Sequence, residues 1–382
     1  ILLFLWQSPA PAGLCVGRAN RLPTGGERAI IRPMLTIDGR MGEGGGQVLR
    51  TSLSLAALTG RPFRLTHVRA NRAKPGLRPQ HLTAVRAVAR LCGAALSGDA
   101  LDSRTLEFRP AMPPQPGRYA FDVSDAAQGG SAGAVMLIFQ AVLWPLLFAA
   151  GPSHVTLRGG TAVSMSPPFH YVDRVARPVF ARMGATFTLE LVRWGWYPVG
   201  GGIVTAEIAP LRRLDAPEFS HLPAGRVEGV AAVTNLPANI PQRMAGRATN
   251  LLAAAGHASA IEPRRENGDG PGAGIFLWLP QGGFSSLGRP GLPSERVAEA
   301  AVAETLAFID NGAMVDRHLA DQLLLPLALA HGQTRYTTDH LTLHTTTNAD
   351  LLRQWLPVTI AITGEMGGPA EIAVTGAGFA NV

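Results

Sequence analysis

One order of elements returns three times along this chain: a helix, a glycine, a strand, a loop, a second helix and a second strand. Apolar periodicity predicts helices over 47–58 and 80–91 in the first unit, 128–148 and 171–183 in the second, and 316–330 and 348–355 in the third. The strands are predicted over 62–68, 154–158, 186–192, 336–343 and 357–363. Because one such unit cannot bury its apolar face alone, we expect three similar α/β lobes packed together.

The stretch from 217 to 311 interrupts this pattern. It holds candidate strands at 227–233 and 274–279, candidate helices at 242–255 and 293–308, and a glycine-rich run at 267–274. We therefore predict a small inserted α/β domain over 217–311, between large-domain segments 34–216 and 312–382. Residues 1–33 start with an apolar fragment that lacks a basic region, and we expect them to be a disordered or non-native extension before a start at Met34.

A glycine-rich loop, Gly42-Glu-Gly-Gly-Gly46, joins the first strand (34–38) to the first helix. Glycines let a backbone approach a ligand closely, and the free N–H groups of a helix start favour an anion. Glu43 and Arg50 flank these glycines, so the loop indicates a phosphate site with a carboxylate that could bind a metal. A tight strand–helix turn is the alternative.

Charge and composition narrow the function. The net charge of +7 favours a polyanionic partner, although Lys74 is the only lysine among the 34 basic residues. The sequence has neither a Gly-x-x-x-x-Gly-Lys phosphate loop nor a Lys-x-Asp-Gly motif, so lysine is not expected to be the nucleophile of a nucleotide-dependent reaction. Two cysteines are too few for a disulfide framework, and we expect a cytoplasmic protein. The apolar stretch 134–150 is too short to span a membrane and is expected to be a buried helix.

Three groups of residues could carry chemistry. The first is a basic loop and helix start with Arg69, Arg72, Gln80 and His81, which suits phosphate but could be a solvated loop. The second is the helix start His318-Leu-Ala-Asp-Gln322, whose acid could instead complement the helix dipole.

The third group is centred on His344, which we place at the end of a strand beside Thr345-Thr-Thr-Asn348. His340 would lie on the same face of a regular strand, so a zinc pair is conceivable, as is a purely structural histidine.

Five stretches together resemble the RNA 3′-terminal phosphate cyclases. They are Gly42–Arg50, Arg69–Thr83, Tyr197-Pro-Val-Gly-Gly-Gly202, His318–Pro326 and His344–Asn348. The resemblance implies an α/β (α+β) fold of three βαβαββ-type lobes with a small inserted α/β domain. It implies an ATP-dependent enzyme that uses Mg²⁺ or Mn²⁺ to convert an RNA 3′-phosphate to a 2′,3′-cyclic phosphate. One departure is Ser164-Met-Ser-Pro-Pro168, where the family usually has Asn or Asp before Ala-Pro-Pro.

The resemblance also assigns roles to residues. His344 is implied as the nucleophile that takes AMP from ATP and passes it to the RNA 3′-phosphate, after which the 2′-OH closes the ring. Glu43 matches the metal-side carboxylate, and Arg50, Arg69, Arg72, Gln80 and His81 match positions around the phosphates and the RNA end. The nucleotide pocket corresponds to Gln140, His318, Leu319, Ala320, Asp321 and Gln322.

Two other functional assignments are alternatives to the cyclase. A catalytically silent relative that acts in ribosome assembly lacks the nucleophilic histidine, and an enolpyruvyl transferase is built from similar lobes. We expect RNA with a 3′-terminal phosphate as the partner, with no membrane and no obligate protein partner.

Overall fold

The computed structural model of the protein describes residues 33–127, 132–222 and 225–380. Residues 33–382 form one compact unit, and the domain boundaries after 216 and 311 stay predictions. The expectation about residues 1–33 lies, apart from Pro33, outside the described residues, as does the predicted helix start at 128–131.

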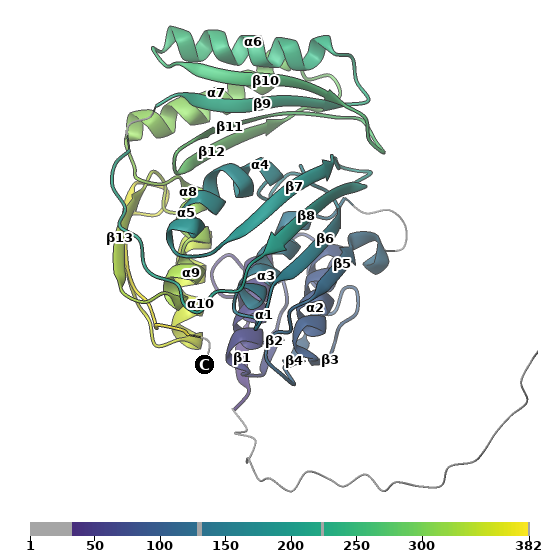
Figure 1. Cartoon of the computed structure of the whole chain (residues 1–382), viewed down its shortest axis with the longest axis vertical. Coiled ribbons are helices and arrows are strands. Elements are labelled where there is room, and N and C mark those ends of the chain that lie inside the picture. The colour runs from purple at the N-terminus through teal and green to yellow at the C-terminus, as the bar shows by residue number, and fades with distance from the viewer. Residues whose placement is uncertain (1–32, 128–131, 223–224, 381–382) are drawn as a thin grey trace, which may run out of the picture. The chain divides into compact units, whose positions relative to one another are not determined.

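The first lobe is a mixed four-stranded sheet in the order β1-β2-β4-β3, in which only β1 and β2 are parallel (Figure 1). Its elements are β1 (Leu35–Asp38), α1 (Gly46–Thr59), β2 (Phe63–Thr66), α2 (Pro79–Cys92), β3 (Ala95–Ser97) and β4 (Leu106–Arg109). Both helices end as predicted, since Gly60 and Gly93 adopt left-handed φ values of 66° and 58° that favour glycine. The βαβαββ order of this lobe is therefore present.

The second lobe repeats that order in the sheet β5-β6-β8-β7. Its elements are β5 (Arg118–Asp122), a 3-10 turn (Val123–Ala126), α3 (Val135–Leu147), β6 (Ser153–Gly159), α4 (Phe169–Tyr171), a π-helical turn (Val172–Ala176), α5 (Arg177–Arg182), β7 (Phe187–Arg193) and β8 (Gly202–Ile208). Helix α3 confirms the expected buried helix, because every residue in it except Gln140 is buried. Within the described ranges, no helix is both long and apolar enough to traverse a lipid bilayer.

The third lobe keeps the same strand order but lacks the first strand. It contains α8 (Arg317–Gln322), α9 (Leu324–Leu329), β13 (Gln333–Thr338), α10 (Leu343–Trp355), β14 (Thr359–Gly364) and β15 (Ala370–Thr375), with the sheet order β13-β15-β14. A single parallel bridge between Val315 and Thr338 occupies the place of the missing strand. The three repeated sheets that the sequence pattern predicted are thus confirmed.

One prediction in this lobe is wrong. The strand expected over 336–343 ends at Thr338, and His344 lies in the first turn of α10 rather than at a strand end. Thr342 begins this helix, because its side-chain oxygen accepts a hydrogen bond from the backbone N–H of Thr345 at 3.2 Å. The strand geometry that would have put His340 and His344 on one face is therefore absent.

The stretch between the second and third lobes forms its own sheet, β10-β9-β11-β12, with α6 and α7 packed against it and each other (Figure 1). Its elements are β9 (Val227–Thr234), α6 (Asn239–Ala254), β10 (Ser259–Glu266), β11 (Gly272–Leu279), β12 (Gly282–Leu287) and α7 (Ser294–Asn311). It has a separate hydrophobic cluster that includes Met244, Phe284 and Phe308. The two predicted strands and two predicted helices are present, and β10 and β12 are additions.

Helices from the three lobes meet in the middle of the molecule. Helix α1 packs against α3 of the second lobe and α10 of the third, and α8 packs against α10. One hydrophobic cluster runs through all three lobes, with Leu49, Phe139 and Leu352 among its buried members. Residues far apart in sequence are thereby held on adjacent helices around one space.

Candidate active site

A cavity of about 580 Å³ lies where these helices meet. Ten of the thirteen side chains that the sequence singled out line it: Arg50, Arg69, Arg72, Gln80, His81, Gln140, His318, Asp321, Gln322 and His344. The volume is in the range of small-molecule sites. Of the remaining three, Glu43 lies beside the cavity, whereas Leu319 and Ala320 are fully buried in the core and do not line it.

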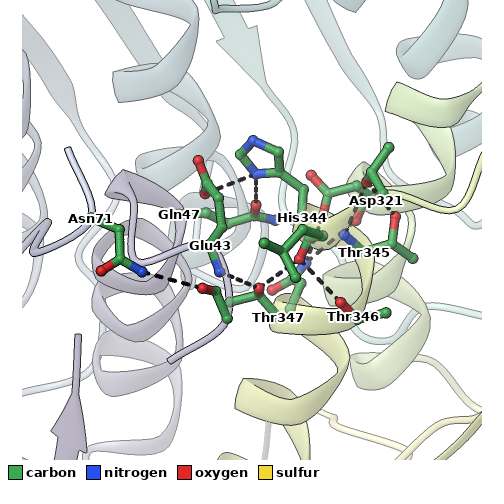
Figure 2. Close-up of polar contacts among 12 residues, drawn as sticks. Glu43, Gln47, Asn71, Asp321, His344, Thr345, Thr346 and Thr347 are labelled. Carbon is green, nitrogen blue, oxygen red and sulfur yellow. Dashed lines mark hydrogen bonds and ion pairs between the residues drawn. The ribbon is translucent and has the colours of Figure 1, made fainter. Parts of the chain in front are cut away.

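The glycine-rich loop is held against α10. Gly42 adopts a φ of +51°, and a side chain there would collide with Thr347. The same Thr347 hydroxyl accepts a hydrogen bond from the backbone N–H of Glu43 at 2.9 Å (Figure 2). Glycine is needed at this position because the two segments approach so closely. The approach brings Glu43 to His344.

His344 projects from α10 toward the loop and α1 (Figure 2). Its Nδ1 lies 2.6 Å from Oε1 of Gln47 and 3.2 Å from Oε2 of Glu43. The side chain is 45% exposed, so the ring is fixed on one side and open on the other. This is the arrangement of an imidazole that is held in place yet can reach a ligand in the cavity.

A hydrogen-bond network holds Gln47, the residue that contacts Nδ1 of His344. The Gln47 amide donates a short hydrogen bond to Oδ1 of Asp321, and Nδ2 of Asn348 donates to the same oxygen at 3.3 Å. Thr51 donates its hydroxyl hydrogen to Oδ1 of Asn348 at 3.2 Å. The network joins α1, α8 and α10, so it depends on the packing of the first lobe against the third.

Burial and positive charge lower the pKa of two imidazoles of the site, those of His344 and His81, and so favour their neutral forms. Burial lowers the pKa of His344, an effect that Arg50 and Arg72 reinforce and that the Asp321 carboxylate opposes. Burial also lowers the pKa of His81 well below its ordinary value, and four arginines around it act in the same direction. The pKa of Arg50 falls to about 10 through burial, so this guanidinium stays charged at neutral pH. Partly buried cations beside neutral rings make a site for an anion.

The basic loop is ordered by its own side chains. Arg69 donates to the carbonyl oxygens of Lys74 and Gly76, both at 2.8 Å, and Arg72 forms an ion pair with Glu43. Gln80 accepts a hydrogen bond from the backbone N–H of Ala134 at 2.8 Å. The loop is thus an ordered part of the cavity wall, which contradicts the alternative of a freely solvated loop.

The helix start at His318 faces the same cavity. The His318 ring is exposed and meets Tyr171 edge to face, with 6.1 Å between ring centroids. Gln322 accepts a hydrogen bond from Gln140 at 2.9 Å, so α8 is joined to α3. The buried Asp316 begins α8 by accepting from the backbone N–H groups of His318 and Leu319 at 2.7 and 2.9 Å. Asp316, rather than Asp321, therefore caps the N-terminus of α8.

Sequence reasoning missed several residues of the site. Gln47 and Asn348 stood inside quoted motifs without a role, and Phe284, Ser285 and Glu304 reach the cavity from the inserted stretch. Gln47 and Thr51 are polar residues in the buried part of α1, and this pattern could have indicated a hydrogen-bond network. Among the described residues, no group of three or more His, Cys, Asp or Glu side chains could hold a metal ion, so the conceived zinc site with His340 has no support.

Comparisons with known proteins identify the family of this chain. The family model described as RNA 3′-terminal phosphate cyclase matches residues 41–362. An RNA 3′-terminal phosphate cyclase of Trichormus variabilis is 52% identical over 329 residues, which cover 84% of this chain and 94% of that protein. One of Methylococcus capsulatus is 53% identical over 83% of this chain and 89% of the relative, and one of Pyrobaculum neutrophilum is 39% identical over 90% and 99%.

The likeness to a solved structure is much weaker. The enolpyruvyl transferase NikO from Streptomyces tendae aligns with a TM-score of 0.37 and 14% identity, covering 91% of this chain and 49% of that one. Such a likeness decides nothing about this chain. Relatives align with most of this chain at about 50% identity, and the family match includes the glycine loop, the basic loop and His344. This chain therefore belongs to the RNA 3′-terminal phosphate cyclase family.

Proposed function

We propose that this protein converts the 3′-terminal phosphate of an RNA into a 2′,3′-cyclic phosphate at the expense of ATP. The observation that carries the proposal is His344, a neutral imidazole fixed by Gln47 at the wall of a cavity that partly buried arginines also line. A catalytically silent relative would have no use for a nucleophile held in this position.

The chemistry proceeds in three transfers. A lone pair of the His344 imidazole attacks the α-phosphorus of ATP, a phosphorus–nitrogen bond forms, and pyrophosphate leaves with the electrons of the broken phosphorus–oxygen bond. An oxygen of the RNA 3′-phosphate then attacks the same phosphorus, and the histidine regains its lone pair. Finally the neighbouring 2′-OH attacks the activated RNA phosphate, loses its proton, and AMP leaves.

Arg50, Arg69 and Arg72 supply the positive charge that phosphoryl transfer needs. His318, Asp321, Gln322 and Gln140 line the same cavity and would hold the nucleotide, with the exposed His318 ring available for stacking on a base. Leu319 and Ala320 support this wall from the core.

Glu43 would hold the divalent ion, Mg²⁺ or Mn²⁺. One carboxylate beside a phosphate site fits such an ion, because Mg²⁺ is commonly bound by one or two carboxylates together with substrate phosphate oxygens. In the free chain this carboxylate is ion-paired with Arg72 and lies 3.2 Å from Nδ1 of His344, so it has to exchange a partner when the ion arrives. The ion would neutralise charge on the polyphosphate.

The test is transfer of label from α-labelled ATP to the protein in the presence of Mg²⁺ or Mn²⁺. We expect an AMP adduct that is labile in acid and stable in base, and a loss of at least about 1,000-fold in His344→Asn, because the nucleophile itself is removed. His340→Asn is the matched control: it removes an imidazole four residues away that does not line the cavity, and should keep the adduct. Equal labelling of the wild type and His344→Asn would refute the proposed nucleophile.

A further inference from the structure

Gln47 stands between an acid and the proposed nucleophile. Its amide nitrogen donates to Oδ1 of Asp321, and its amide oxygen lies 2.6 Å from Nδ1 of His344 (Figure 2). Gln47 as a whole residue is 8% exposed, so water cannot readily replace either partner. The resemblance gave this glutamine no role.

The orientation of the Gln47 amide follows from its partners. Oδ1 of Asp321 accepts hydrogen bonds from the NH₂ groups of both Gln47 and Asn348, the latter at 3.3 Å. The NH₂ group of Gln47 must therefore face Asp321, which leaves its oxygen facing His344. The orientation of Asn348 is fixed in turn, because Thr51 donates to its oxygen at 3.2 Å.

An amide oxygen opposite Nδ1 requires a proton on Nδ1. A neutral imidazole carries one ring proton, so Nε2 then holds the free lone pair. The second neighbour of Nδ1, Oε2 of Glu43 at 3.2 Å, is also an acceptor and demands the same tautomer. Glu43 is the more distant of the two and is shared with Arg72.

We propose that Gln47 is a positioning residue that relays the orientation of Asp321 to His344, holds the proton on Nδ1 and thereby presents Nε2 as the nucleophile. This inference rests on the proposed function, because it names the atom that would take the nucleotide. It adds a role for a cavity-lining residue that takes no part in the proposed transfers themselves.

An amide fixes the tautomer without adding a charge of its own. The Glu43 carboxylate also lies against Nδ1, at 3.2 Å, but it is paired with Arg72. The ring has to be neutral when it attacks, because an imidazolium has no lone pair to offer. It becomes cationic once the phosphorus–nitrogen bond forms, and the Gln47 oxygen can keep its hydrogen bond from the Nδ1 proton in both states.

The tautomer can be measured directly. In protein labelled with ¹⁵N-histidine, long-range proton–nitrogen spectra distinguish a protonated Nδ1 from a protonated Nε2, and His344→Asn identifies the signals among the ten histidines. We expect His344 of the wild type to carry its proton on Nδ1. In Gln47→Met, which keeps the side-chain length but has no oxygen, the Nε2-protonated form should become populated.

The adduct assay supplies the second readout. Gln47→Met should slow adduct formation by about 10- to 100-fold, the range seen when a functional imidazole loses its outer partner, with the KM for ATP little changed. Gln140→Met is the matched control, since it removes another cavity glutamine that bonds Gln322, and it should leave the His344 tautomer unchanged.

Each outcome decides the inference. A wild-type ring protonated on Nε2 overturns it without any variant, so it stays testable even if Gln47→Met does not fold. An unchanged tautomer in a folded Gln47→Met protein overturns it as well, even if the adduct rate falls. A failure of the proposed function would give a different result, namely AMP labelling that persists in His344→Asn.

Discussion

The cavity around His344 and the aromatic junction around His170 both lower the pKa of an imidazole, but their surroundings are opposite. In the junction, which we define as Trp194, Trp196 and Phe276 around His170, that ring stacks on Trp194 and Phe276 with centroid distances of 5.1 and 5.2 Å. Its buried Nδ1 has no hydrogen-bond partner among the described residues. His344, in contrast, has two acceptors at Nδ1, is 45% exposed and lines a cavity together with partly buried arginines.

The comparison shows that a lowered pKa does not by itself identify a catalytic residue. Burial is the first cause of the shift at both histidines. At the junction the ring is packed so that the inserted sheet and the second lobe share one apolar cluster. At the cavity the ring has specific polar partners on two other elements, and that is the feature that points to chemistry.

The largest effect expected outside the nucleophile is on stability in acid. The pKa of folded His170 is lowered from 6.5 to about 3, so below pH 6.5 the unfolded chain binds a proton that the folded chain does not. The free energy of unfolding should therefore decrease as pH falls below 6.5, by roughly 1.4 kcal/mol for each pH unit. At about pH 5, which is about 1.5 units lower, the loss is about 2 kcal/mol.

Denaturant unfolding of the wild type and His170→Phe at neutral pH and in acid measures this effect. The variant should lack the loss, because phenylalanine does not titrate and fits an aromatic stack. Adduct formation at neutral pH should stay within about 2-fold of the wild type, since the junction does not contact the reaction. A variant that loses stability in acid as steeply as the wild type would contradict the assignment.

An effect of about 10-fold is expected within the cavity. Arg72 lines it and pairs with Glu43, so Arg72→Ala should slow ring closure on a 3′-phosphorylated RNA about 10-fold more than it slows adduct formation. Single-turnover assays of the two steps measure the difference. Arg78→Ala is the control, because Arg78 pairs with Asp102 at 2.5 Å and does not line the cavity. An equal loss in both steps would mean that Arg72 serves ATP instead.

The smallest effect is the pH dependence of adduct formation. The pKa of His344 lies below its ordinary value of 6.5, so the ring remains unprotonated as pH falls through that value. We expect the rate to change less than about 2-fold between pH 8 and pH 6.5 and to fall only in more acidic solution. A rate that halves at or above pH 6.5 would show that the arginines and burial do not control this ring.

The sequence alone determined the elements whose signals are local. Helices α1 and α2 were found because each carries an apolar stripe and ends at a glycine with positive φ. The same reasoning placed His344 at the end of a strand, because Leu341-Thr-Leu343 alternates like one. The capping hydroxyl of Thr342 was the local signal that was overlooked. Strands β3, β4, β5, β8 and β15 were not predicted, since several are short and partly exposed.

The tertiary structure alone decided how the site is connected. Ten of the residues that motifs suggested share one cavity because helices of three lobes pack together, and no spacing along the chain shows this. Gln47 and His344 are 297 residues apart, and their contact exists only because α1 and α10 pack against each other. Sequence fixes which groups are present, whereas the direction of each hydrogen bond depends on the partners that packing brings within about 3 Å.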